Sequence, residues 1–139
     1  MRTQLPDAVK RIIDANINRS KEGLRVCEEV TRFILEDASL TAALKKVRHE
    51  INSLAGSLAG ARALQEARDA RRDTGRYLYG KELIRRDHGD IFSANMQRAK
   101  ESIRVLEEFS KLSRRRTAVR FKELRYTLYE IEKKVLKKL

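Results

Sequence analysis

The chain has 139 residues, of which 41% are hydrophobic and 37% are charged, and its formal net charge at pH 7 is +12. This length suits one domain with a hydrophobic core, and the hydrophobic fraction excludes an intrinsically disordered chain. The single cysteine excludes an internal disulfide and suggests a reducing compartment, and neither a membrane span nor a signal peptide is visible, so a cytoplasmic location is expected.

Four long helices are predicted from apolar residues that recur at helical spacing. Their approximate ranges are 7–37, 40–68, 91–112 and 118–139. Ser39, Asp90 and Thr117 precede the second, third and fourth of these ranges, and they are the predicted N-caps. Residues 69–89 form the long connection, in which a short helical turn is expected near 81–85.

Part of the first helix occurs twice in the sequence. Residues 15–33 and 94–112 share nine identities in nineteen positions at a constant offset of 79, and residues 45–49 resemble 122–126 at an offset of 77. The sequence therefore predicts an all-α fold, a four-helix bundle built from two duplicated helical hairpins with pseudo-two-fold symmetry. The expected organisation is a single domain over 1–139, with repeat one at about 7–68, a loop at 69–89 and repeat two at about 90–139.

A helical wheel of the repeated stretch places two polar residues among the apolar ones. Asn16 and Arg19 fall within the apolar face, Glu22 lies on its border, and Glu28 falls on the polar face. The equivalents of the first three in the second copy are Asn95, Arg98 and Glu101. Two interpretations remain open: a buried Arg19–Glu22 ion pair that ties helices together, or a polar cavity for an anionic ligand in which the glutamates orient the guanidinium groups.

The long connection begins with a dense group of charges, RDARRDTGR at 68–76. One interpretation is a solvated connection. The other is a segment that binds metal and phosphate, with Asp69 or Asp73 contacting Mg²⁺ and Arg72 or Arg76 contacting phosphate.

Five motifs in order carry a resemblance to a known family. They are RIIDANINRSKEGLRVCEEVTRF, LKKVRH, RDARRDTG, ANMQRAKESIRVLEEFSKL and FKELRYTLYEIEK. Together they resemble the hydroxymethylpyrimidine phosphate kinase domain that is found at the N-terminus of some bacterial thiamine phosphate synthases and that also occurs alone. The resemblance implies an enzyme, in stand-alone form or as an excised domain, that uses ATP to convert hydroxymethylpyrimidine phosphate to its diphosphate in thiamine biosynthesis.

Residue roles can be assigned on this basis. The acceptor phosphate is largely dianionic at neutral pH, so the site needs charge neutralisation and alignment more than a strong base. We therefore predict Arg19 and Arg98 as the catalytic residues, with Arg48 and Arg125 completing the two halves of the site. A tyrosine is expected to stack on adenine or on the pyrimidine, either Tyr126 or Tyr129.

Other functions remain open at this point. The positive charge also fits a helical module that binds nucleic acid. A third possibility is a non-catalytic partner of thiamine phosphate synthase, which binds the pyrimidine diphosphate and passes it on without consuming ATP. An oligomer is also open, since an apolar strip on the helix at 40–68 or at 118–139 could pair with a second copy.

Overall fold

The structure is a computed structural model, which describes residues 4–77 and 83–139. Within these ranges the chain forms helices and no strand, which confirms the predicted all-α class. The helical turn expected near 81–85 falls partly outside the described residues. The elements in chain order are α1 (Asp7–Glu29), the π-helical turn η1 (Val30–Ile34), α2 (Ala38–Leu58), α3 (Ala61–Ala67), the 3₁₀ turn η2 (Ala70–Arg72), α4 (His88–Ser110) and α5 (Arg115–Leu136).

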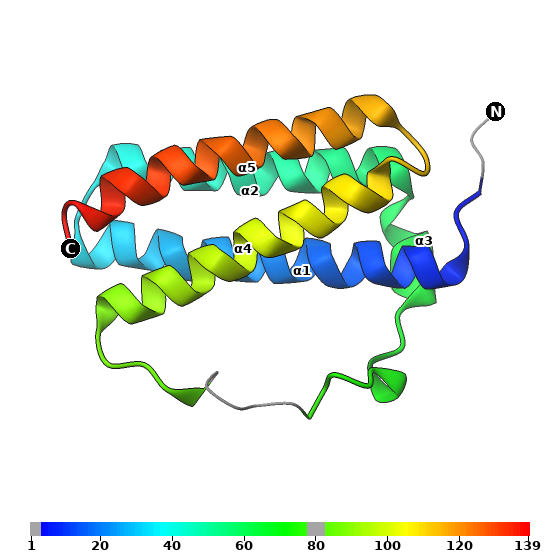
Figure 1. Ribbon diagram of the computed structural model, residues 1–139, viewed down its shortest axis with the longest axis horizontal. Helices are drawn as coiled ribbons and strands as arrows, with labels where there is room; N and C mark the ends of the chain where they lie inside the picture. The colour runs from blue at the N-terminus through cyan, green and yellow to red at the C-terminus, as the bar shows by residue number, and fades with distance from the viewer. Residues whose placement is uncertain (1–3, 78–82) are drawn as a thin grey trace.

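The four longest helices pack around one core (Figure 1). α1 contacts both α2 and α4, and α5 contacts both α4 and α2, so each of these helices has two neighbours. The short helix α3 packs against α1. All four long helices contribute large side chains that are fully buried, which include Ile13, Leu24, Leu44, Ile51, Phe92, Met96, Ile103, Leu106, Phe121, Leu128 and Val135.

Two helices are shorter than the sequence predicts, for local reasons. α1 gives way to the π-helical turn, and the N–H of Leu35 after it donates to the carbonyl of Val30 at 3.0 Å. Glu36, two residues beyond the turn, has a φ of 52°. The helix predicted at 40–68 is interrupted because Ala59 and Gly60 both adopt extended backbone conformations.

The predicted N-caps are also displaced. Asp37, and not Ser39, caps α2, and its Oδ1 accepts a backbone N–H of the first turn at 2.9 Å. In the same way Asp87 caps α4 and accepts the N–H of Asp90 at 2.8 Å. α5 begins two residues before Thr117 and has no side-chain cap. In both capped helices an aspartate slightly earlier in the chain provides the acceptor for the free N–H groups.

Small residues line the contact between α1 and α4. Ser20 and Gly23 of α1 and Ala99 and Ser102 of α4 are all buried. A Cβ atom added to Gly23 would lie only 2.7 Å from the backbone oxygen of Asn95. The hydroxyl of Ser102 bonds within its own helix, donating to the carbonyl of Ala99 at 3.1 Å. The two backbones can therefore approach closely because no bulky side chain separates them.

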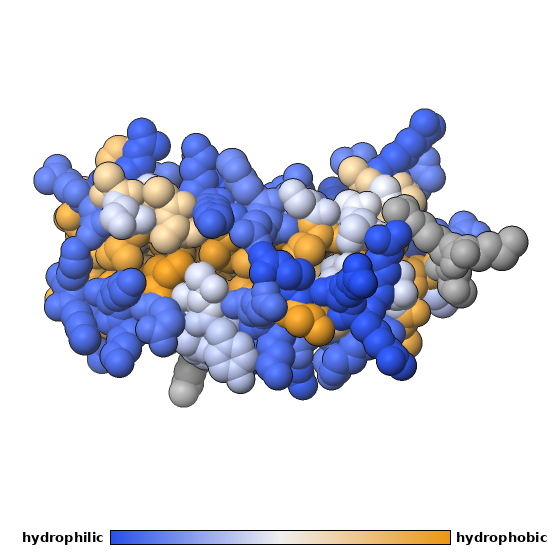
Figure 2. All heavy atoms as spheres, turned by 90° about the horizontal axis from the view of Figure 1, so that it is seen from above, coloured by the Kyte–Doolittle hydropathy of each residue, from blue (hydrophilic) through white to orange (hydrophobic). Residues whose placement is uncertain are grey.

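Charged side chains cover most of the face shown in Figure 2, with apolar residues visible between them. Among the described residues no helix is long and apolar enough to cross a bilayer. Large apolar side chains on α5 are nevertheless exposed, including Val119, Tyr126 and Leu136, whereas those of α2 are covered. Of the two helices on which an apolar strip could pair with a second copy, α5 is the one with large exposed apolar side chains among the described residues.

The close helix contact leads to a prediction about Gly23. We expect Gly23→Ala to lower the free energy of unfolding by about 1–3 kcal/mol, because the added methyl group forces α1 and α4 apart. The control is Gly56→Ala in α2, where a Cβ meets nothing within 4 Å. That change should instead stabilise by about 0.5–1 kcal/mol through helix propensity. Urea denaturation of both variants checks the prediction, and equal shifts of the same sign would contradict it.

A second prediction concerns Cys27, which is fully buried and donates to the carbonyl oxygen of Phe92 at 3.7 Å. Burial, with smaller effects of the Glu132 and Glu28 charges, raises the pKa of the thiol from 9.0 to about 12. Above pH 9.0 the unfolded chain loses a proton that the folded chain keeps, so the stabilising contribution of the neutral thiol is lost as pH rises toward the folded pKa.

We therefore expect the free energy of unfolding of the wild type to fall more steeply above pH 9.0 than that of Cys27→Ala. Denaturation curves at a series of pH values measure both slopes. Iodoacetamide should modify the wild-type thiol only after denaturant is added, because the thiolate is the reactive form. Rapid alkylation of the folded protein would show that the thiol is accessible.

Candidate functional site

A groove lies between α1 and the segment that follows α3, and we call it the α1 groove. Its volume is about 750 Å³. It brings together five of the residues that the sequence predicts for the site, namely Asn16, Arg19 and Glu22 from α1, and Asp69 and Asp73 from the segment after α3. The polar residues of the first repeat and the aspartates of the long connection therefore share one surface.

A bidentate ion pair fastens this segment to α1. Arg68 donates from Nε and from Nη2 to the two carboxylate oxygens of Asp14, each at 2.7 Å. Asp14 is buried, and hydrogen bonding to its carboxylate, followed by the attraction of its charge, raises the pKa of the Arg68 guanidinium. Arg11 adds a hydrogen bond from Nη2 to the backbone oxygen of Asp69 at 3.3 Å. These contacts hold Asp69 beside α1.

The sequence analysis does not single out Asp14 or Arg11, although both line the α1 groove. A signal for them is present, because Arg11, Asp14 and Asn18 recur at helical spacing as a polar strip. Such a strip is usually solvated, and only the position of the segment after α3 shows that it lies in a groove.

Asp69 and Asp73, the predicted Mg²⁺ ligands, also shape their own segment. Oδ1 of Asp69 accepts the N–H of Arg72 at 3.2 Å, and Oδ1 of Asp73 accepts the N–H of Gly75 at 2.9 Å. Residues 4–77 and 83–139 contain no group of three or more His, Cys, Asp or Glu that could hold a metal ion. Mg²⁺ commonly takes only one or two carboxylates and completes its shell with water and substrate phosphate. The two aspartates therefore remain the predicted ligands.

The structure corrects the placement of Arg19. Asn16 is buried, as the wheel predicts, and its Nδ2 donates to the carbonyl of Ile12 at 2.8 Å. Arg19 and Glu22 are exposed, so the expectation that Arg19 lies in the buried face is wrong, and so is the alternative of a buried Arg19–Glu22 pair. The wheel misplaces Arg19 because the side of α1 that carries Arg19 faces the open α1 groove and is not covered by another helix. Arg19 makes no hydrogen bond or ion pair with any described residue, which leaves its guanidinium available to an anion.

The corresponding residues of the second repeat lie outside the α1 groove. Nδ2 of Asn95 donates to the carbonyl of Ile91 at 2.8 Å, as in the first repeat. Arg98 and Glu101 are both exposed, and Glu101 accepts a hydrogen bond from Gln97 at 2.9 Å. Described residues of the segment after α3 line the α1 groove together with Arg19 and not with Arg98, so the two Asn/Arg pairs have different surroundings.

Arg48 and Arg125, predicted to complete the site, each hold a buried glutamate. Arg48 binds Glu28 through Nε at 2.6 Å and through Nη2 at 3.1 Å, and Arg125 donates from Nη2 to Glu107 at 3.1 Å. Both glutamates are 4% exposed. The placement of Glu28 on a solvated polar face is therefore wrong, because a wheel of one helix cannot show that α2 covers that side. The sequence repeat does contain a sign of this contact, because Glu28 and Arg48 recur together as Glu107 and Arg125.

Tyr126 lies in a different groove, between α4 and α5, together with Arg125. Its ring meets that of Tyr129 edge to face with centroids 5.7 Å apart, and Cζ of Arg125 lies 5.4 Å from its centroid. The residue is 55% exposed, so one part of the ring surface is open to a ligand.

The fold and the site define a small helical domain with a polar groove in which arginines and carboxylates meet. The sequence profile of the ThiD2 family matches residues 11–134, and the chain belongs to the ThiD2 family.

Curated relatives are longer than this chain. The thiamine-phosphate synthase of Synechocystis sp. is 37% identical over 137 residues, which cover 98% of this chain and 38% of the relative. That of Nostoc punctiforme is 37% identical over 134 residues, with 96% and 37% covered, and that of Rhodopirellula baltica is 38% identical over 122 residues, with 87% and 32% covered. The chain thus spans a little over a third of the first relatives that it matches. No solved structure matches it.

The ion pair beneath the α1 groove leads to a further prediction. We expect Asp14→Asn to destabilise the fold by about 1 kcal/mol, because the amide replaces a charged acceptor of two hydrogen bonds from Arg68. Trypsin should also cleave faster after Arg71 and Arg72, because their segment loses its attachment to α1. Asp7→Asn, the same change at an exposed position of α1, is the control for cleavage and should leave the cleavage rate unchanged, because Asp7 pairs with Lys10 and not with Arg68. Unchanged cleavage in Asp14→Asn would show that Arg68 does not anchor the segment.

Proposed function

We propose that this chain acts in thiamine biosynthesis by binding a phosphorylated pyrimidine in the α1 groove. The observation that carries the proposal is that Arg19, which has no partner among the described residues, meets two aspartates, Asp69 and Asp73, in one groove of small-molecule size. The arginine supplies a cationic donor for phosphate, and the aspartates supply ligands for a phosphate-bound Mg²⁺. Membership of the ThiD2 family and similarity to proteins named thiamine-phosphate synthase support the pathway.

One function that follows from such binding is an accessory role. The curated relatives are named for the synthase reaction, and this chain matches only part of each of them. In this function the chain holds the pyrimidine diphosphate and delivers it to a thiamine phosphate synthase, without consuming ATP. The names of the relatives favour this function.

The second candidate function is the kinase reaction that the resemblance implies. An oxygen of the pyrimidine monophosphate attacks the γ-phosphorus of ATP, a new phosphorus–oxygen bond forms, and the bond to ADP breaks. Because the acceptor is a phosphate dianion, catalysis needs neutralisation and alignment of two polyanions and no strong base. In the α1 groove, Arg19 can neutralise phosphate charge, and Asp69 and Asp73 can bind Mg²⁺. Arg98 lies outside this groove, so the catalytic role predicted for both arginines is proposed for Arg19 alone.

We also infer that α1–α2 and α4–α5 are copies of one hairpin, which form a four-helix bundle with pseudo-two-fold symmetry. The Glu28–Arg48 and Glu107–Arg125 pairs support this inference, because they occupy positions that the sequence repeat relates. The hydrogen bonds of Asn16 and Asn95 to their own helices are also alike.

The repeat provides a matched pair of variants to test the proposed function. Arg19 and Arg98 are equivalent in sequence and both are exposed, but only Arg19 lines the α1 groove. Calorimetry should show that Arg19→Ala weakens binding of the pyrimidine monophosphate by roughly tenfold or more, while Arg98→Ala binds like the wild type. Equal losses in both variants would indicate general charge attraction and would overturn the site.

An ADP-release assay with ATP, Mg²⁺ and the pyrimidine monophosphate distinguishes the two functions. Turnover that falls in Arg19→Ala supports the kinase, and pyrimidine phosphate binding without turnover supports the accessory role. Failure to bind either pyrimidine phosphate, combined with salt-sensitive RNA binding, would overturn both in favour of a nucleic-acid-binding module.

A further inference from the structure

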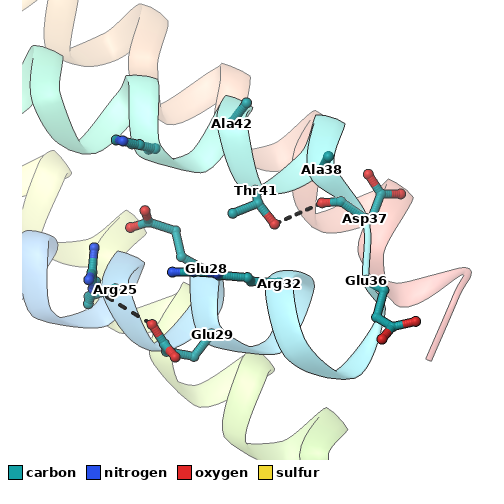
Figure 3. Close-up of a pocket in the computed structure, with 10 residues that line it drawn as sticks. Arg25, Glu28, Glu29, Arg32, Glu36, Asp37, Ala38, Thr41 and Ala42 are labelled. Carbon is teal, nitrogen blue, oxygen red and sulfur yellow. Dashed lines mark hydrogen bonds and ion pairs between the residues drawn. The ribbon is translucent and has the colours of Figure 1, made fainter.

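Each helical hairpin carries a groove between its two helices. The α1–α2 groove has a volume of about 660 Å³ and is shown in Figure 3, and the α4–α5 groove has a volume of about 900 Å³. Several lining residues occupy equivalent positions of the repeat, among them the pairs Arg25 and Arg104, Glu28 and Glu107, and Lys45 and Lys122. The two grooves can therefore be compared position by position.

The α1–α2 groove is balanced in charge. Its basic residues are Arg25, Arg32 and Lys45, and its acidic residues are Glu28, Glu29, Glu36 and Asp37. Figure 3 shows the carboxylates distributed around the groove, with Arg25 paired to Glu29 at 3.8 Å. Asp37 is further engaged by the N-terminus of α2 and by Lys138. An incoming anion would therefore meet carboxylates in this groove.

The α4–α5 groove, in contrast, is strongly basic. Its basic residues are Arg104, Lys111, Arg115, Lys122 and Arg125, and Glu107 is the single acidic residue in the described part of its lining. Arg115 stands where the first hairpin has Ala38, and the acidic Glu36 and Asp37 have no acidic equivalent. The groove thus combines five positive charges with one negative charge.

Internal ion pairs account for only part of this positive charge. Glu107 is buried and is bound by both Arg104 and Arg125, and Lys111 pairs with Glu108 at 2.7 Å. Arg115 and Lys122 are exposed and make no hydrogen bond or ion pair with any residue in the described ranges. Two cations at the same groove therefore remain without a counter-charge from the described residues, and like charges so placed attract anions.

We propose that the α4–α5 groove binds a di- or triphosphate attached to a planar ring, such as a nucleotide. Arg115 and Lys122 contact the phosphates, and the open surface of Tyr126 stacks on the ring. The aliphatic side chains of Ala118 and Val119 add an apolar part to the same groove. The volume falls in the range of small-molecule sites, and the basic residues line one groove, which favours a small ligand over an extended nucleic acid.

This inference does not rest on the proposed function, because the two grooves share no lining residue. In either candidate function the pyrimidine phosphate binds in the α1 groove, so the ligand of the α4–α5 groove is a second ligand of the domain. ATP is the probe for it, because ATP carries both a triphosphate and a planar ring.

The test compares equivalent lysines in the two hairpins. Calorimetry with ATP at a fixed salt concentration should show that Lys122→Glu weakens binding by about tenfold or more. Lys45→Glu changes the total charge by the same amount at the equivalent exposed position and should leave binding unchanged. Circular dichroism confirms that both variants are folded. Equal effects of the two changes, or no saturable binding of ATP to the wild type, would overturn the proposal.

Two further measurements examine the ring and the competing ligand. Tyr126→Ala should weaken binding of ATP and leave binding of inorganic tripolyphosphate unchanged, because only the nucleotide has a ring to stack. Equal weakening of both ligands would refute the stacking. Arg19→Ala should leave the Lys122-dependent binding of ATP intact, so a failure of the α1 groove can be distinguished from a failure here. An RNA oligonucleotide that binds more tightly than ATP and depends on Lys122 would overturn the proposal in favour of a nucleic-acid surface.

Discussion

The close approach of α1 and α4 is the constraint on which the rest of this structure depends. Gly23 faces the backbone of α4 at a distance that leaves no room for a side chain, and small residues continue the contact on both sides. Because the two central helices meet backbone to backbone, α2 and α5 can each pack beside one of them and against each other. The same contact leaves the outer sides of the hairpins free, and there the α1, α1–α2 and α4–α5 grooves lie.

Helical spacing in the sequence was sufficient to predict the all-α class, because apolar stripes such as that of α5 are regular and few breakers interrupt them. It was not sufficient for Arg19 and Glu28. A wheel assumes one buried and one solvated side, whereas α1 is contacted by α2, α3 and α4. Arg19 therefore lies in a groove although it falls beside apolar residues, and Glu28 is buried although it falls beside charged ones, because Arg48 reaches it from α2.

Only part of the candidate site could be predicted from the sequence. Asn16 and Arg19 were identified from their unusual position in the helix, and Asp69 and Asp73 from the charge density of their segment, but the sequence holds no sign that the two groups meet. Their meeting depends on the Arg68–Asp14 ion pair, which joins residues far apart in the chain. The basic character of the α4–α5 groove was hidden in the same way, since Arg115, Lys122 and Arg125 are ordinary surface residues until the helices are placed side by side.

The division of contacts between the hairpins has a consequence for assembly. The Glu28–Arg48 and Glu107–Arg125 pairs each lie within one hairpin, whereas the α1–α4 and α2–α5 contacts join the two. A long connection between α3 and α4 links the hairpins, so two chains can exchange them and rebuild the same core by domain swapping. The α1 groove and the two grooves within the hairpins would survive that exchange intact. Monomer and swapped dimer would then carry the same binding sites per chain, and the ligands alone would not favour either form.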